Sequence, residues 1–306
     1  MIVVAGEALV DLVTDRAGGG GRPTVSLGGA PYNVARACGR LGADVALVAS
    51  ISTDGHGDAL VQALADDGVA LDLVSRTDAP TTIAHADVDV DGVARYRFEI
   101  DGTAAPALTS VDVPTGAIAV FTGGLGLVLE PMGTSIERAV VATGGSALVM
   151  VDLNCRPAVI ADRSTYLARV DRVLARADVV KASDEDLRFV SHDLDAIESA
   201  RRLLRLGPRI VLLTAGGAAT TVVCATGERV VDVPAVPVVD TIGAGDAFAA
   251  GFLTWWTIGG RTASELTDID AVERGVVAGH QVAAVVVGRR GADPPTRSDL
   301  PPTWPP

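Results

Sequence analysis

The chain has 306 residues, of which 48% are hydrophobic and only 4% aromatic, so its core must be built mainly from Ala, Val, Leu and Ile. The formal net charge is −13 and there is no run of Lys or Arg, which argues against binding to a nucleic-acid backbone. Three scattered cysteines and four histidines fit neither a disulfide framework nor the spacing of metal ligands.

The N-terminal segment MIVVAGEALVDLV is typical of a strand rather than of a signal peptide, because it has no basic region and carries Glu7 and Asp11. No apolar run reaches the ~18 residues that a membrane helix needs. We therefore expect a cytoplasmic protein that does not contact membranes.

Buried strands and helices alternate along most of the chain, which predicts a largely parallel sheet with helices on both faces. Such sheets bind ligands at the carboxyl ends of their strands. The expected strands are Ile2–Ala5, Asp44–Ala49, Ile118–Thr122, Ala147–Asp152, Val179–Lys181 and Ile210–Thr214. The expected helices are Pro31–Leu41, Gly57–Asp66, Ser135–Ala142, Ser164–Ala175, Leu194–Leu206 and Ala247 to about Ile258.

One segment departs from this alternation. Apolar and polar residues alternate over 84–90, Asp91–Gly92 gives a strong hairpin signal, and a second alternating run follows over 93–100. An isolated hairpin is marginally stable in water, so its apolar face must cover a substrate or a second subunit. We predict a small lid, to which residues 9–27 add strands, with Gly18–Gly21 as a turn. The proline-rich tail, 294–306, is expected to be extended surface chain.

The segment DTIGAGDAFAAGF, residues 240–252, carries the strongest functional signal. Small residues at 243–245 precede an apolar helix, so that backbone N–H groups and the helix dipole favour an anion there. Asp246 lies at the same point, where a carboxylate could take a proton from a hydroxyl that attacks a phosphoryl group. The alternative is that Asp246 only caps the helix.

Two common nucleotide motifs are missing. A Walker loop needs Gly-Lys before Ser or Thr, and the only lysine, Lys181, follows Val180. GGLGLV at 123–128 is too imperfect for a dinucleotide fingerprint, which argues against the α/β oxidoreductase that the strand–helix pattern would otherwise permit.

Two separate motifs resemble the signatures of the PfkB (ribokinase-like) carbohydrate kinase family. DTIGAGDAFAAGF resembles the C-terminal signature, and GGAPYNVARACGRLG at 28–42 resembles the N-terminal one. The similarity extends over essentially the whole chain through GEALVDL, LEP, DLNCRP, KASDEDL, LLTAGG and RRGADPPT. It implies a single α/β domain over 1–306, a three-layer sandwich with a mostly parallel sheet, and a β lid from about 9–27 and 82–101.

The resemblance also assigns residues to the sugar. The implied sugar contacts are Asp11, Gly28, Gly29 and Asn33, and Glu130 matches a carboxylate on the sugar side. Tyr96 and Phe98 on the ribbon are further candidates for contact with the acceptor. Arg156 would lie near the sugar or the transferred phosphate, unless it is an ordinary surface arginine. Asn33 could likewise be a polar residue on a helix surface.

On the nucleotide side the resemblance implies contacts to ATP from Lys181, Ser183, Asp186, Thr214, Gly216, Gly217, Gly245 and His280. Ser183 and Asp186 stand where the family has Asn and Glu, so direct contact of Asp186 with Mg²⁺ would have a shorter reach. His280 could instead be a helix histidine packed on its neighbours. Asp240, Ile242 and Gly291 match a loop for a monovalent cation, which makes K⁺ a candidate ion.

These assignments predict in-line transfer of a phosphoryl group from Mg·ATP to a primary sugar hydroxyl. Asp246 would be the general base and residues 243–246, Gly243, Ala244, Gly245 and Asp246, the anion hole. Fructose is the preferred acceptor, with 2-keto-3-deoxygluconate and ribose as alternatives and nucleosides less favoured. A sugar-binding protein with a decayed active site is a further alternative, against which the intact GAGD argues. We expect a homodimer through the lid.

Overall fold

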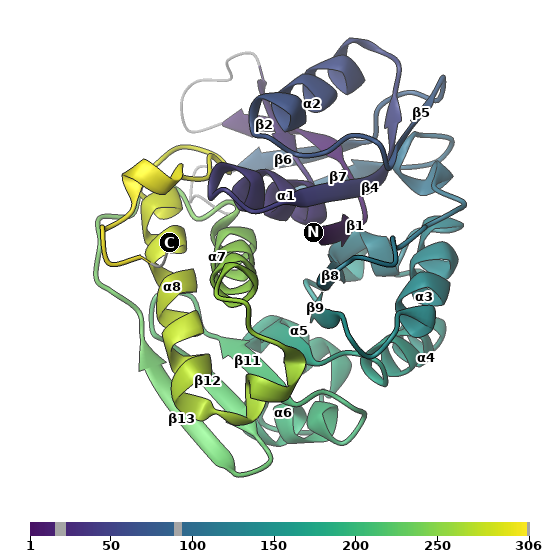
Figure 1. The fold of residues 1–306 in the computed structure, drawn as a ribbon. Coiled ribbons are helices and arrows are strands. Elements are labelled where there is room, and N and C mark those ends of the chain that lie inside the picture. The colour runs from purple at the N-terminus through teal and green to yellow at the C-terminus, as the bar shows by residue number, and fades with distance from the viewer. Residues whose placement is uncertain (16–22, 89–93, 305–306) are drawn as a thin grey trace.

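The computed structural model describes residues 1–15, 23–88 and 94–304. Their elements form three layers, in which a nine-stranded sheet lies between two layers of helices (Figure 1). The strand order is β13-β12-β11-β10-β9-β8-β1-β4-β5. Neighbouring strands are parallel from β11 to β5, whereas β12 runs antiparallel to both β11 and β13. The strands are β1 (Ile2–Ala5), β4 (Val45–Ser52), β5 (Val74–Thr77), β8 (Ala119–Gly123), β9 (Leu148–Asp152), β10 (Val179–Ser183), β11 (Ile210–Thr214), β12 (Ala219–Cys224) and β13 (Gly227–Asp232).

Helices cover both faces of this sheet, so that its central strands are buried throughout. One face packs on α1 (Ala30–Arg40), α2 (Gly55–Asp66), α7 (Ala244–Ile258) and α8 (Ile269–Val287). The other packs on α3 (Met132–Ala142), α4 (Arg163–Leu174), α5 (Asp184–Val190) and α6 (Ala196–Leu204). Short 3₁₀ turns are η1 (Ala105–Ala107), η2 (Gly124–Leu127), η3 (Pro157–Val159), η4 (Ala263–Thr267) and η5 (Arg297–Asp299). The α/β sandwich expected from the sequence is confirmed.

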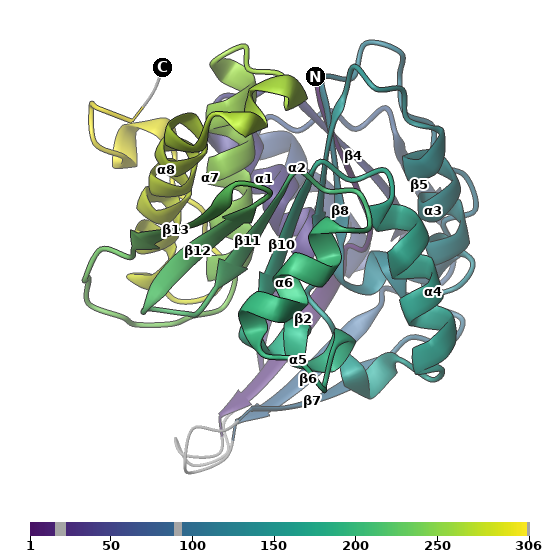
Figure 2. The same cartoon turned by 90° about the horizontal axis from the view of Figure 1, so that it is seen from below.

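A second, smaller sheet projects beyond one end of the large sheet (Figure 2). Its order is β3-β2-β6-β7, from β2 (Leu9–Asp15), β3 (Thr24–Gly28), β6 (Ile83–Val88) and β7 (Ala94–Glu99). β6 and β7 are the predicted antiparallel ribbon, and β2 joins it by parallel pairing with β6. The ribbon is therefore stabilised by two further strands. The predicted turns at 18–21 and 91–92 lie outside the described residues.

The C-terminal tail corrects one expectation. Residues 294–304 are not merely extended surface chain, because Leu300 and Trp304 are buried and η5 forms between them and the preceding loop. The Trp304 indole N–H donates to the Ala278 carbonyl of α8 at 3.2 Å. The apolar residues at 300 and 304 are what dock the tail, despite its prolines.

The sequence reasoning missed β5, β12, β13, α5 and α8. No helix among the described residues is long and apolar enough to cross a membrane.

Candidate active site

A cavity of about 710 Å³ opens where the parallel strands of the large sheet end. Its floor comes from the segments that follow β1, β8 and β9, together with Lys181 of β10. The N-terminal turns of α1 and α7 form one wall, and the small sheet covers it. The lining residues are Glu7, Leu9, Asp11, Val13, Gly29, Ala30, Asn33, Ala84, Phe98, Gly124, Leu125, Asn154, Cys155, Arg156, Pro157, Ala158, Lys181, Glu185, Thr241, Ile242, Gly243, Gly245 and Asp246.

The start of α7 has the geometry of an anion site. Gly243 caps the helix in the left-handed conformation, with φ of 76°, and a Cβ there would lie 2.5 Å from the Cβ of Ala292. The Ala244 N–H donates to the Thr241 carbonyl at 3.2 Å, so it is already engaged. The N–H groups of Gly245 and Asp246 belong to the first turn, where a helix supplies no acceptor. These two donors and the helix dipole favour an anion at this point.

Asp246 is buried, and its carboxylate lines the cavity instead of capping its own helix. Its Oδ2 accepts a hydrogen bond of 2.8 Å from Nδ2 of Asn33 in α1. The pKa of Asp246 is raised to about 6, mainly by burial and also by Asp152, although Asn33, Lys181 and Arg156 act to lower it. Asp246 is thus ionised near neutral pH yet basic enough to accept a proton.

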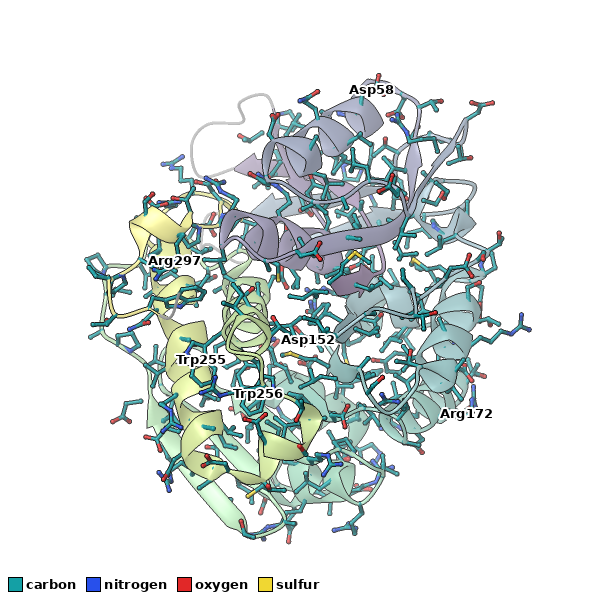
Figure 3. The ribbon with its side chains drawn as sticks, in the orientation of Figure 1. Asp58, Asp152, Arg172, Trp255, Trp256 and Arg297 are labelled. Carbon is teal, nitrogen blue, oxygen red and sulfur yellow. The ribbon has the colours of Figure 1, made fainter. Side chains whose placement is uncertain are left out.

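Lys181 forms a buried ion pair with Asp152, whose Oδ2 lies 2.7 Å from Nζ. Asp152 ends β9 in the interior of the molecule (Figure 3). Burial lowers the pKa of Lys181, but the carboxylates of Asp152, Asp186 and Asp246 outweigh it, so the net shift is upward. A Cβ at Gly245 would lie 3.1 Å from Nζ. The ammonium is therefore held charged directly beside the start of α7.

The side of the cavity formed by α1 and the small sheet contains several carboxylates. Burial raises the pKa of Asp11 to about 6, and Arg156 opposes this. A Cβ at Gly28 would lie 2.1 Å from Oδ2 of Asp11, so Gly28 lies against that carboxylate although it does not line the cavity itself. Gly29 and Asn33 do line it. Arg156 lines the cavity as well, where Nη1 donates to the backbone carbonyl of Cys155 at 3.1 Å.

Ser183 and Asp186 form a capping box at the start of α5 and do not line the cavity. One Asp186 oxygen accepts from the Cys155 N–H at 2.6 Å, and the other accepts from the Ser183 N–H and hydroxyl at 2.8 and 2.7 Å. Both oxygens are thus engaged within the protein. Of the acidic residues in the KASDEDL motif, the one that lines the cavity is Glu185. The sequence did not indicate this.

The remaining nucleotide-side residues lie away from the lining. Thr214 ends β11, and Gly216 and Gly217 follow it in the turn to β12. His280 is buried between α8 and β12, where its Nε2 lies 2.8 Å from the Thr220 hydroxyl, and burial lowers its pKa. His280 is therefore packed against its neighbours, as the alternative interpretation of the sequence expects.

Asp240 links two loops beside the anion site. Its carboxylate accepts from the N–H of Ile242 at 3.0 Å and from the N–H of Gly291 at 2.8 Å. The three residues expected at a monovalent-cation loop are thus brought together, although only Ile242 lines the cavity. Among the described residues no cluster of three or more His, Cys, Asp or Glu side chains could hold a metal ion.

Glu130 is not brought to the cavity. It is ion-paired with Arg169 and accepts hydrogen bonds from the backbone N–H and the hydroxyl of Thr134, with its side chain half-exposed. Its expected sugar contact has no support in this arrangement. Phe98 of β7 lines the cavity, whereas the side chain of Tyr96 lies outside the described residues.

The chain is similar in sequence to known carbohydrate kinases. The model of the pfkB family carbohydrate kinases matches residues 1–299. A fructokinase from Rhizobium leguminosarum bv. trifolii is 36% identical over 259 residues, covering 83% of this chain and 78% of that protein. A fructokinase from Klebsiella pneumoniae is 35% identical over 262 residues, covering 82% and 83%.

Solved structures agree with these matches. Fructokinase with bound ATP from Xylella fastidiosa superposes with a TM-score of 0.87 at 25% identity, covering 98% of this chain and 94% of that one. A fructokinase double mutant from Vibrio cholerae O395, with fructose, ADP and potassium bound, shares the fold at 24% identity and a TM-score of 0.82, covering 95% and 93%. These matches show that the chain belongs to the pfkB family of carbohydrate kinases and is an ATP-dependent sugar kinase.

Proposed function

We propose that this chain is a fructokinase, which transfers the terminal phosphoryl group of ATP to a primary hydroxyl of fructose with Asp246 as the general base. The observation that carries the proposal is the position of the buried Asp246 carboxylate, at the cavity wall in the first turn of α7, beside two N–H groups without helical acceptors. A base and an anion site in one turn are what transfer from a phosphate to a hydroxyl requires.

In the proposed reaction Asp246 takes the proton of the sugar hydroxyl as that oxygen attacks the phosphorus. The bond from phosphorus to the bridging oxygen breaks, and ADP leaves with its electron pair. The N–H groups of Gly245 and Asp246 stabilise charge on the transferring group, each by ~2.7–4 kcal/mol if they act as oxyanion donors do. The Lys181 ammonium and the Arg156 guanidinium add positive charge at the same place.

The charge of the cavity supports a neutral acceptor. Glu7, Asp11 and Asp246 line the side where α1 and the small sheet meet. Burial raises the pKa of all three carboxyl groups, and Arg156 opposes this in each case. A sugar acid such as 2-keto-3-deoxygluconate would bring a further negative charge to this surface, at an electrostatic cost. Fructose or ribose, by contrast, offers hydroxyls that carboxylates accept. The fructokinase relatives favour fructose between these two.

Asn33 is proposed to contact the acceptor as well as the base. Its Nδ2 is engaged by Asp246, and its buried Oδ1 has no partner within the described part of the chain. A buried amide oxygen without a partner costs free energy. A sugar hydroxyl that donates to Oδ1 on binding would remove that cost, and it would place the hydroxyl near the base.

Mg²⁺ bound to ATP would neutralise charge on the phosphates. Glu185 lines the cavity and could hold such an ion through water, whereas both oxygens of Asp186 are engaged elsewhere. We propose that the phosphates of ATP lie along Lys181 and Gly245. The rest of the nucleotide would follow the β11–β12 turn, with Thr214, Gly216 and Gly217, and His280 would lie on the side of the adenine. The loop of Asp240, Ile242 and Gly291 is the proposed K⁺ site.

The small sheet is proposed to act as a lid and as the interface of a homodimer in the cytoplasm. Closing it over the cavity would exclude water and limit wasteful hydrolysis of ATP. The apolar side chains that it places over the cavity, Leu9, Val13, Ala84 and Phe98, support the first role. Size-exclusion chromatography tests the role as a dimer interface, and a monomer in solution would exclude that role.

The experiment that tests the function measures ADP release from ATP with fructose, ribose, 2-keto-3-deoxygluconate and a nucleoside. Each is assayed with and without Mg²⁺, and with K⁺ or Na⁺. We expect Mg²⁺-dependent release that is fastest with fructose. Faster ADP release with another sugar would make that sugar, rather than fructose, the proposed acceptor. No release with any of them, together with binding of a sugar, would indicate a sugar-binding protein instead.

A further inference from the structure

We propose that Glu7 is a positioning residue for the acceptor side of the site, holding two separate backbone turns against the cavity. The proposal rests on the proposed function only for its kinetic consequences, because the contacts that carry it are in the protein itself. Glu7 follows β1, is buried, and lines the cavity.

Both oxygens of the Glu7 carboxylate accept from backbone groups of distant segments. Oε1 accepts from the N–H of Ala30, the first residue of α1, at 3.2 Å, and Oε2 accepts from the N–H of Gly126 in η2 at 2.9 Å. The Ala30 N–H lies in the first turn of α1, where the backbone supplies no acceptor, and Gly126 is the third residue of the short η2 turn. The carboxylate therefore joins segments that are nearly a hundred residues apart, and residues of both line the cavity.

Two glycines lie where any side chain would collide with Glu7. Gly29 has a φ of 107° and a Cβ there would lie 2.6 Å from the Glu7 carbonyl oxygen, while Gly124 has a φ of 57° and a Cβ there would lie 2.9 Å from Oε1. Both are positions where a side chain would be strained and would also collide with Glu7. Glycine at these two positions therefore lets both turns lie close to Glu7.

The contact also reaches the base through α1. Glu7 fixes the N–H of Ala30, the Asn33 N–H donates to the Gly29 carbonyl at 2.9 Å, and the Asn33 side chain donates to Asp246. The first turn of α1 is thus held at one end by Glu7 and bears the partner of Asp246 at the other. Losing one of the Glu7 contacts would loosen the acceptor wall and the orientation of the base together, without touching the nucleotide side.

The variant Glu7→Gln tests this, because a glutamine keeps the size of the side chain but can accept from only one of the two N–H groups. With the best acceptor of the wild-type enzyme, we expect the acceptor KM to rise roughly tenfold or more and kcat to fall less, with the KM for ATP within about twofold of wild type. Glu7→Asp keeps the charge but has a shorter side chain, so its acceptor KM is expected to lie between those of wild type and Glu7→Gln. Glu228→Gln, on β13 and outside the cavity lining, is the matched control.

Amide hydrogen exchange gives a readout that does not need activity. We expect faster exchange at residues 29–33 and 124–128 in Glu7→Gln than in wild type or Glu228→Gln, and unchanged exchange on the nucleotide side at residues 214–217. Unchanged acceptor KM together with unchanged exchange would overturn the proposal, and so would an equal rise of both KM values. If the wild-type enzyme phosphorylates no sugar, the proposed function fails, and the exchange data alone decide the role of Glu7.

Discussion

Asn33 Nδ2 donates a 2.8 Å hydrogen bond to Asp246 Oδ2, joining the first turns of two helices whose residues are 213 positions apart. The contact places one residue of each signature motif in the same site. It also has an electrostatic effect, because a donor to the carboxylate stabilises its ionised form and opposes the effect of burial on the pKa of Asp246.

The pH dependence of the reaction follows from that contact. Because burial raises the pKa of Asp246 to about 6, the base becomes protonated as the pH falls through 6, and kcat/KM should decline there. Asn33→Ala removes a donor that lowers this pKa, so the acidic limb should move to higher pH. Kinetics between pH 5 and 8 measure the limb, and a limb that stays in place or moves to lower pH would contradict this account.

The buried pair of Lys181 and Asp152 should show strong coupling. Lys181→Met leaves the Asp152 carboxylate buried without a partner, at a cost of about 3–5 kcal/mol in the free energy of unfolding. Asp152→Leu combined with Lys181→Met should recover most of that stability and yet remain poorly active, because no ammonium then faces the phosphoryl group. Urea unfolding and kcat separate the two effects. A fully active double variant would show that the lysine is only structural.

Gly243→Ala should damage the anion site more than an ordinary left-handed glycine would. The new Cβ meets Ala292 at 2.5 Å in addition to the strain of φ 76°, so kcat should fall and stability should drop by more than about 1 kcal/mol. Gly260→Ala is the matched control, since Gly260 has a φ of 66° with open space around it. It should lose stability only, by about 1 kcal/mol. Equal kcat in the two variants would contradict the assignment.

Trp304 should anchor the tail to α8. Trp304→Ala removes a fully buried side chain and its hydrogen bond to Ala278, at an expected cost of about 3–5 kcal/mol in the free energy of unfolding. Thr303→Ala, at an exposed neighbouring position, should be nearly neutral. Urea denaturation compares the two. A neutral Trp304→Ala would mean that the tail does not stabilise the fold.

The sequence predicted the parallel strands and most helices because buried strands and amphipathic helices have clear periodicities. It missed β12 and β13, whose residues do not form a continuous apolar run, and the docking of the tail, where two apolar residues outweigh the prolines. The small sheet was predicted as a ribbon with possible additions, since pairing between β2 and β6 depends on contacts between distant residues.

The site was predicted best where motifs and chemistry coincide. Asp11, Asn33, Arg156, Lys181 and Asp246 all reach one cavity. Glu7 and Glu185 line the cavity and Asp152 pairs with Lys181, and all three were missed although each lies in a quoted motif. Local sequence does not show which of several neighbouring acids faces the cavity or its lysine. Glu130 was assigned to the sugar from the family resemblance, and its pairing with Arg169 of α4 could be found only in three dimensions.

The measurement that tests the account most directly is the turnover of Asp246→Asn with Mg·ATP and the best sugar acceptor. Asparagine keeps the size of the side chain but cannot accept the proton, so kcat should fall by about 10²–10⁴-fold while ATP binding and thermal stability stay close to wild type. Near-normal turnover by a folded Asp246→Asn variant would contradict the assignment of Asp246 as the base.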